Sequence, residues 1–279
     1  MLKVPKFKSY FHIEVVPSVG VFLLSESDYY ILTGELYEKL VPLINGDRSV
    51  DDQVATLGDR VSVAEIYYAL MLMEQKGYIV ENTETVSPEV EAFWDFLDVD
   101  ASEADRRLQS TGVSITALSN IPTQPLSTAL QQLNIQVVPS GEIEIVLTDD
   151  YLRIELEQIN HKALESRRPW MLVKPVGKII WIGPIFHPGK TGCWQCLAQR
   201  LQANRPLENF IRERKTVSSL ATKSRAELPS TMQTAINLSA KKIAKSLVHS
   251  SDRSLEVNIS TFDTISRKIK YNNINKLNQ

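Results

Sequence analysis

The chain contains very little cysteine, and this scarcity excludes one class of protein. Only Cys193 and Cys196 occur in 279 residues, so a disulfide framework of the kind that holds small secreted domains together is excluded. The N-terminus carries lysines but lacks the apolar core and the small-residue cleavage site of a signal peptide. We therefore expect a protein of the reducing cytoplasm.

Long apolar runs and an excess of one charge are also lacking. No apolar run approaches the roughly 18 residues that cross a bilayer, so we expect no membrane partner. The formal net charge of -2, from 31 basic and 33 acidic residues, argues against a general nucleic-acid binder. With 43% hydrophobic residues, the chain has the composition of a soluble globular protein that is long enough for two domains.

Strand and helix patterns predict a compact first domain over residues 1–82. Short β-branched and aromatic runs at 11–17, 20–24 and 29–32 are typical of strands. Three helices follow over 35–46, 49–58 and 62–77, the last two with Ser49 and Ser62 at their N-caps, and a last strand lies near 78–80. Residues 83–90 are polar and contain a proline, which is typical of a linker.

Residues 91–279 alternate between strand and helix patterns. Strands are predicted at 113–118, 135–138, 142–147, 170–174, 179–182 and 255–264, and helices at 126–133, 150–167, 194–202 and 229–249. Such alternation indicates βαβ units, and hence a mainly parallel sheet covered by helices in a Rossmann-like α/β domain.

The third predicted helix of the first domain lacks a polar face. Residues 66–73 are apolar at eight consecutive positions, so side chains such as Tyr67 and Met71 remain to be covered when Ile66 and Leu70 point inward. Packing against the second domain or a dimer partner would cover them, and so would a peptide added to a strand edge at 29–32. A DNA-binding winged helix has the same outline, but its recognition helix would carry more cations than Lys76.

The stretches FHIEVVPSVGVFLLSESDYYILTG, ELYEKLVPLING and SVAEIYYALMLMEQKGYIVE resemble a known peptide clamp. This winged-helix-like α+β domain of three strands and three helices, the RiPP recognition element, lies at the N-terminus of azoline-forming cyclodehydratases. It holds the leader of a ribosomally made precursor peptide. The resemblance implies that the strand edge is offered by Tyr29, Tyr30, Ile31 and Leu32, and that the pocket is lined by Ile66, Tyr67, Leu70, Met71 and Glu74. It further predicts that Leu70→Asp or Met71→Asp abolishes leader binding without unfolding the domain.

The stretch WMLVKPVGKIIWIGPIFHPGKTGCWQCLAQRLQANR, residues 170–205, resembles the degenerate ThiF-like, ubiquitin-activating-like domain of cyanobactin heterocyclases. A member of this fold that uses ATP needs a glycine-rich turn after its first strand. Here SNIPTQP, residues 119–125, has two prolines and no glycine. We therefore expect ATP only in a catalytic domain outside these residues. Asp149 and Asp150 are interpreted as a helix-start cap, although a residual role near a ligand stays open.

The motif CWQC favours half of a structural zinc site at Cys193 and Cys196. A redox dithiol and two buried bystander thiols are the alternatives. His187, six residues upstream, is a conceivable third ligand, but the family pattern instead supplies a second Cys pair later in the chain. We therefore expect a fragment that ends before that second pair and before the YcaO-type catalytic domain. A second copy of the chain, in a homodimer, could instead supply its own Cys pair.

These features predict a leader-binding and scaffolding role rather than catalysis by this stretch alone, and no catalytic residue is assigned. The intact enzyme would be an ATP-dependent cyclodehydratase that converts Cys, Ser or Thr of a precursor peptide to thiazoline or oxazoline. The alternatives are a stand-alone ThiF-like adenylating enzyme and a winged-helix DNA-binding regulator.

Overall fold

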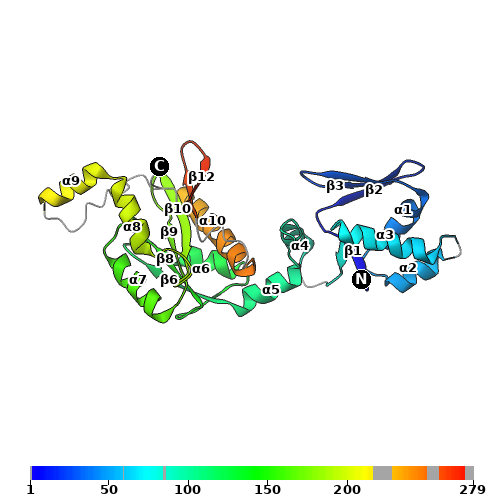
Figure 1. Ribbon diagram of the computed structural model, residues 1–279, viewed down its shortest axis with the longest axis horizontal. Helices are drawn as coiled ribbons and strands as arrows, with labels where there is room; N and C mark the ends of the chain where they lie inside the picture. Colours follow the sequence, from blue (N-terminus) through cyan, green and yellow to red (C-terminus); the bar gives the residue numbers. More distant parts are fainter. Residues whose placement is uncertain (1, 59, 84–85, 216–227, 250–257, 274–279) are drawn as a thin grey trace. The chain divides into compact units, whose positions relative to one another are not determined.

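A computed structural model describes residues 2–58, 60–83, 86–215, 228–249 and 258–273. The chain divides into two compact units, residues 1–105 and 106–279 (Figure 1). Each unit has its own hydrophobic core, and each is described by itself below. No helix among the described residues is both long and apolar enough to span a membrane.

The first unit has the winged-helix-like α+β fold expected from the sequence. Its strands β2 (His12–Val16), β3 (Gly20–Leu24) and β4 (Tyr29–Leu32) form an antiparallel sheet in the order β2-β3-β4. A second ladder joins β1 (Pro5–Phe7) to β5 (Ile79–Glu81). The helices are α1 (Glu35–Leu40), α2 (Val50–Leu57), α3 (Val63–Gln75) and α4 (Pro88–Asp95), with a 3-10 turn at Val41–Leu43. Helix α5 (Ala101–Ser110) crosses the boundary between the units.

Local capping chemistry fixes where two of these helices begin. The Asp52 N–H donates to Ser49 Oγ at 3.1 Å before α2, and the Ser62 N–H donates to a Glu65 carboxylate oxygen at 3.3 Å before α3. Both helices therefore start at the residues that the sequence indicates. Their inward faces meet the sheet in one core that includes Leu23, Leu40, Ile66, Leu70 and Met73.

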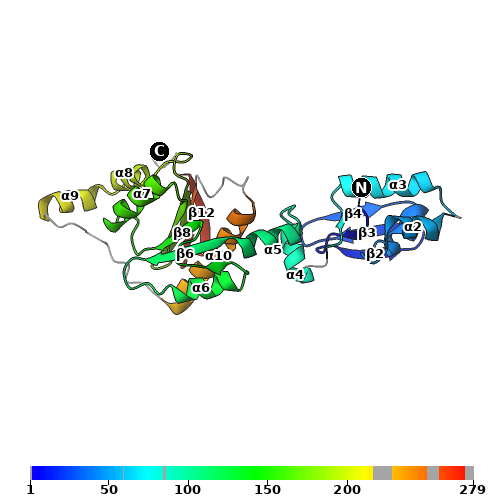
Figure 2. The same ribbon diagram turned by 90° about the horizontal axis from the view of Figure 1, so that it is seen from below.

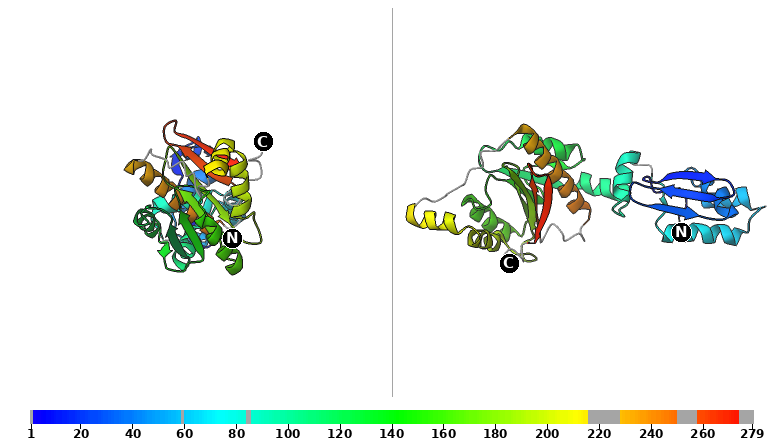
Figure 3. Two further views of the ribbon diagram at one scale, coloured as in Figure 1. Left: turned by 90° about the vertical axis from the view of Figure 1, so that its left-hand side faces the viewer. Right: turned by 90° about the horizontal axis from the view of Figure 1, so that it is seen from above.

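The second unit is a seven-stranded sheet with helices on both faces. Its strands are β6 (Gly112–Ala117), β7 (Gln136–Val137), β8 (Ile143–Leu147), β9 (Trp170–Lys174), β10 (Ile179–Phe186), β11 (Asn258–Asp263) and β12 (Lys268–Asn273), in the order β12-β11-β10-β9-β8-β6-β7. Its helices are α6 (Gln124–Gln131), α7 (Glu155–Ser166), α8 (Trp194–Ala203), α9 (Pro206–Lys215) and α10 (Pro229–Val248). Helices α6 and α10 cover one face, and α7 and α8 cover the other (Figures 2 and 3).

The expectation of a mainly parallel sheet is wrong for half of this unit. Strands β7, β6, β8 and β9 pair in parallel, but β9 through β12 pair antiparallel. For the pairs β9–β10 and β11–β12 the reason is the length of the connections: residues 175–178 and 264–267 are too short for a crossover, so each can only close a hairpin. Within the strand predicted at 255–264, residues 258–263 form β11, and 255–257 lie outside the described residues.

Candidate functional site

The strand β4 is the outer strand of its sheet, and it carries large exposed side chains. It pairs with β3 on one side only in the described sheet. Tyr29 is 75% exposed, Ile31 50% and Tyr30 37%. An edge strand with apolar side chains and unused backbone groups can accept another extended chain.

The pairing register shows which backbone groups face away from the sheet. The Ser25 N–H donates to the Asp28 carbonyl at 2.8 Å, so these two residues form a hydrogen-bonded pair at the start of the hairpin. A Cβ atom built on Gly20 would lie 2.7 Å from the Leu32 carbonyl oxygen, so that carbonyl points toward β3. Hydrogen-bonded pairs alternate along an antiparallel ladder. Tyr30 and Leu32 therefore bond to β3, and the N–H and C=O groups of Tyr29 and Ile31 point outward.

Successive side chains of β4 point to opposite faces of the sheet, and Tyr30 and Leu32 share one face. Leu32 packs against the core that contains Ile66 and Leu70 of α3. The Tyr30 ring lies 4.8 Å from the Tyr78 ring. A guest strand at this edge would thus place every second side chain beside Tyr30, Leu32 and the α3 side of the sheet.

Helix α3 divides the predicted pocket residues into two groups. Ile66 and Leu70 are 0% and 3% exposed and belong to the core, so they lie beneath the surface instead of forming it. Met71 is 40% exposed, and Tyr67 and Glu74 are half-buried. The Tyr67 hydroxyl donates to Asp51 of α2 at 3.3 Å.

Tyr68 is an exposed residue of α3 that sequence reasoning left out of the pocket. Its side chain is 62% exposed. Burial, and secondarily the Tyr68 phenol, raise the pKa of Tyr37 on α1, so Tyr68 lies toward α1, the helix that follows β4. Tyr67, in contrast, faces α2. A helical wheel centred on the buried residues would have indicated that neighbouring positions 67 and 68 leave the core on different sides.

The exposed side of α3 does not resemble a DNA-reading surface. Between Val63 and Gln75 the helix carries no arginine or lysine, and Lys76 follows it as the C-cap. Base edges and phosphates are read chiefly by cationic and amide side chains, and Gln75, at the C-terminal end, is the one residue of these types within this helix.

In the second unit, a charged cluster fills the carboxyl ends of the parallel strands. Arg153 donates to Ser119 after β6 at 2.7 Å and to Asp149 after β8 at 2.9 Å. Burial alone would raise the pKa of Asp149, but hydrogen bonds from Arg153 and Ser119 outweigh it and lower that pKa. Asp150 pairs with Arg205 at 3.5 Å. The interpretation of Asp149 and Asp150 as a helix-start cap is wrong, because α7 begins at Glu155 with Ile154 as its N-cap and without a side-chain cap. The two carboxylates instead hold Arg153 and Arg205.

The two cysteines lie at the start of α8, with Cys193 as its N-cap. Their sulfur atoms are 3.8 Å apart. Two thiolates on one tetrahedral zinc ion, each bonded at about 2.3 Å, stand about 3.8 Å apart, and this separation is also that of an ordinary contact between two thiols. Trp194 between them is fixed by its indole N–H, which donates to the Tyr151 carbonyl at 2.9 Å. Among the described residues, no group of three or more His, Cys, Asp and Glu side chains is placed to hold a metal ion.

Comparisons with known proteins agree with this architecture. Residues 6–81 match the family model of a winged helix-turn-helix domain. The solved structure of the heterocyclase TruD is 37% identical to the chain, with a TM-score of 0.89 over 97% of this chain and 41% of that one. The chain is similar to heterocyclases. A heterocyclase solved in complex with substrate and cofactor is also 37% identical, with a TM-score of 0.85 over 98% of this chain and 38% of the other.

More distant structures share the fold alone. The MccB protein of E. coli, solved with ATP, is 14% identical over 97% of this chain and 96% of its own, with a TM-score of 0.61. The comparison with curated proteins gave no match. The chain spans about two fifths of the length of the heterocyclases that it resembles, at 41% and 38%.

Proposed function

We propose that the chain is the recognition and scaffolding part of a heterocyclase and that its first unit binds the leader of a ribosomal precursor peptide. The observation that carries this proposal is the open edge of β4, where the N–H and C=O groups of Tyr29 and Ile31 point outward beside exposed side chains. The similarity to heterocyclases over nearly the whole chain supports it.

The physical basis of recognition is strand addition. A guest peptide that pairs with Tyr29 and Ile31 gains backbone hydrogen bonds whatever its sequence. Its alternate side chains supply selectivity where they meet the α3 side of the sheet. Binding energy from a leader that lies far from the reacting residues raises the local concentration of the core peptide at the catalytic domain.

Ile31→Pro is the sharpest test of this edge. The Ile31 N–H points outward, so proline removes a donor for the guest strand but no hydrogen bond to β3, and proline is tolerated on such edge positions. The matched control is Ile31→Val, which keeps the N–H. We would select 12-residue peptides from a random display library on the full chain and measure their affinity by fluorescence anisotropy.

We expect selected peptides to bind the parent chain and the Ile31→Val variant alike, and Ile31→Pro at least tenfold more weakly with an unchanged circular dichroism spectrum. Selected peptides that bind Ile31→Pro as tightly as the parent would show that recognition does not use the β4 edge. A selection that yields no binder to the folded chain would count against peptide recognition altogether.

For the complete heterocyclase we propose ATP-dependent conversion of Cys, Ser or Thr to thiazoline or oxazoline, as in cyanobactin-like biosynthesis. The ATP and the chemical step are assigned to a YcaO-type catalytic domain, which is a partner of these residues. The support is the similarity to heterocyclases that are more than twice as long as the matched region. This step is tested by incubating a precursor peptide with the complete enzyme and ATP and measuring, by mass spectrometry, the loss of one water per ring formed.

We also propose a structural zinc ion held in part by Cys193 and Cys196. The 3.8 Å sulfur separation fits two ligands of a tetrahedral site, and two further ligands must come from elsewhere in the enzyme or from a second copy of the chain. Zinc content per chain, measured for the parent and for Cys193→Ser, tests this. One zinc per two chains, together with a zinc-dependent dimer, would identify the second copy as the source, and zinc that survives Cys193→Ser would exclude the site.

A further inference from the structure

Helix α4 lies outside the winged-helix match but inside the first compact unit. The family model ends at residue 81, whereas the unit extends to residue 105. We infer that α4 is a working part of the peptide-binding unit and that Phe96, at its C-terminal end, is a positioning residue for the edge strand β4. This inference rests on the proposed binding of a peptide at that edge.

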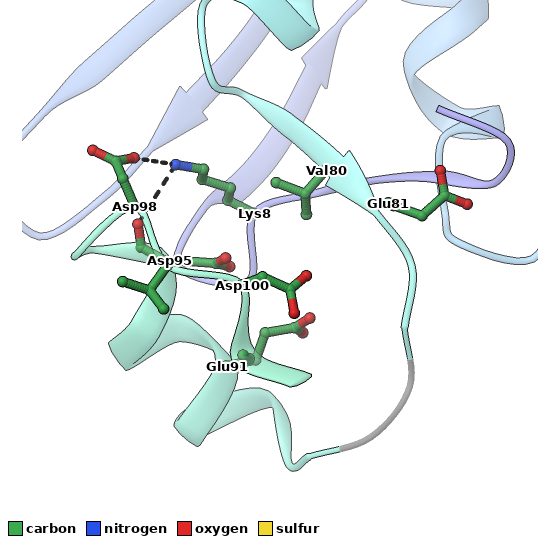
Figure 4. Close-up of a pocket in the computed structure, with 9 residues that line it drawn as sticks. Lys8, Val80, Glu81, Glu91, Asp95, Asp98 and Asp100 are labelled. Carbon is green, nitrogen blue, oxygen red and sulfur yellow. Dashed lines mark hydrogen bonds and ion pairs between the residues drawn. The ribbon is translucent and has the colours of Figure 1, made fainter. Parts of the chain in front are cut away.

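The first observation is a set of polar contacts that join α4 and the turn after it to residues 6–9, and Figure 4 shows those made by Lys8. Lys8 Nζ pairs with Asp98 at 2.6 Å, and the Ser9 N–H donates to Asp95 at 2.8 Å. Glu91 accepts from the Ser9 hydroxyl and pairs with Lys6 at 2.6 Å. The partners that these acidic residues contact all lie within residues 6–9.

The contacts of Glu91 and Asp95 are largely shielded from water, which distinguishes them from ordinary surface ion pairs. The Lys8–Asp98 pair is shielded on the lysine side only, because the Asp98 side chain is 87% exposed. Lys8, Glu91 and Asp95 are 6%, 7% and 6% exposed. They line a cavity of about 160 Å³ together with Val80, Asp98 and Ala101. Partners buried in this way are costly to separate, so the orientation of residues 6–9 is fixed by α4.

The second observation is a continuous row of aromatic rings that runs from α4 to β4. Phe96 stacks on Tyr10 with centroids 4.3 Å apart, and Tyr10 contacts Phe11 at 4.4 Å. Phe11 lies edge-on to Tyr30 at 5.9 Å and to Tyr78 at 6.0 Å. Tyr30 is a β4 residue on the α3 side of the sheet, beside which alternate side chains of the proposed guest strand would lie, and Tyr78 also contacts it.

The polar contacts and the ring row converge on the same short segment. Because residues 6–9 are fixed by α4, the neighbouring Tyr10 and Phe11 are held in place, with Phe11 against Tyr30. The Phe96 ring packs on Tyr10 at the other end of the row. Phe96 stacks on Tyr10, so it acts on the edge through Tyr10 and Phe11. Removal of its ring leaves Tyr10 free to tilt and loosens the packing behind Tyr30.

The test uses the full chain and three variants. Phe96→Leu removes the aromatic stack, Phe96→Tyr restores it, and Val90→Ala is the control because Val90 is an apolar residue of the same helix that is 45% exposed. The probe is a library-selected peptide whose binding is lost in Ile31→Pro. We expect Phe96→Leu to weaken its binding about three- to tenfold, which is the range of an aromatic pair, and the other two variants to bind as the parent does.

A readout in the free chain separates positioning from general stability. We expect Phe96→Leu to raise amide hydrogen exchange at residues 29–32 while exchange within the core of α3 stays unchanged. Equal binding and equal exchange for Phe96→Leu and the parent would overturn the inference, as would a rise in exchange over the whole unit. Either result leaves the proposed function standing as long as Ile31→Pro abolishes binding; loss of that dependence would instead remove the proposed function.

Discussion

At the scale of single residues, Tyr151 illustrates how the second unit satisfies a buried polar group. Its side chain is 1% exposed, and the single proton of its hydroxyl is shared between the Leu172 and Gly183 carbonyls, whose oxygens lie 3.0 and 2.6 Å from the hydroxyl oxygen. Tyr151→Phe keeps the ring and leaves these buried carbonyls without a donor, so we expect a loss of about 1–3 kcal/mol in the free energy of unfolding. Urea denaturation measures it. Tyr271→Phe, at a residue that is 70% exposed, is the control and should change little; equal midpoints for both variants would contradict the prediction.

Tyr10 gives a residue-scale prediction that depends on pH. Burial, and then the nearby Asp98, raise the pKa of Tyr10 from 10.0 to about 12. A phenol whose pKa is higher in the folded state contributes stability that is complete below about pH 10 and is lost as the pH rises toward 12. We therefore expect Tyr10→Phe to unfold at the same urea concentration as the parent at pH 8 and to lose less stability than the parent between pH 9 and 11. Parallel losses in the two proteins would show that another group is responsible.

At the scale of elements, α3 separates a core face from an exposed face. Leu70 is 3% exposed and Met71 is 40% exposed, so the two aspartate substitutions expected from the sequence to act alike should differ. Leu70→Asp buries an unpaired carboxylate and should unfold the first unit, whereas Met71→Asp should remain folded. Circular dichroism and thermal denaturation test this, with Tyr68→Asp as a second exposed variant. A folded Leu70→Asp protein would show that the core around α3 is more open than the burial indicates.

Elements whose limits are set by contacts between residues close in sequence were predictable, whereas elements that depend on contacts between residues far apart in sequence were not. The starts of α2 and α3 follow from Ser49 and Ser62, because a cap and its partner lie three residues apart. Strand β1 has three residues and includes Pro5, so it has no strand signal of its own and exists only because β5 pairs with it. The contact of Phe96 with Tyr10 joins residues 86 positions apart, which no local pattern encodes.

The candidate site shows the same limit. The β4 edge at residues 29–32 was predictable from its composition and from its place before α1, and the outward groups of Tyr29 and Ile31 follow only from the register with β3. Tyr68 stayed outside the predicted pocket because a run of eight apolar residues gives no periodicity from which to choose a face. Positions 67 and 68 separate only once Ile66 and Leu70 are taken as the buried face. The antiparallel half of the large sheet was missed because the short connection between β9 and β10 was interpreted within an alternating pattern and β12 was not predicted at all.

At the scale of the whole molecule, the choice between a heterocyclase part and an adenylating enzyme depends on the carboxyl ends of β6, β8 and β9. A nucleotide in a sheet of this kind binds at that edge through backbone N–H groups of a glycine-rich turn. Residues 119–125 contain two prolines and no glycine. Ser119, Asp149 and Glu155 instead bond to one arginine, Arg153, and burial lowers the pKa of the nearby Lys174.

We therefore expect the chain to show no ATP–pyrophosphate exchange, with or without a peptide that binds the β4 edge. The reason is chemical: the loop lacks the donors that would hold the phosphates, and Arg153 is already engaged by two carboxylates and a hydroxyl. Exchange of labelled pyrophosphate in the presence of Mg²⁺ measures the activity, and the same protein sample must bind the peptide to show that it is folded. Saturable exchange would identify an adenylating enzyme, because a heterocyclase part that only recognises and docks has no means of activating a carboxylate at this edge.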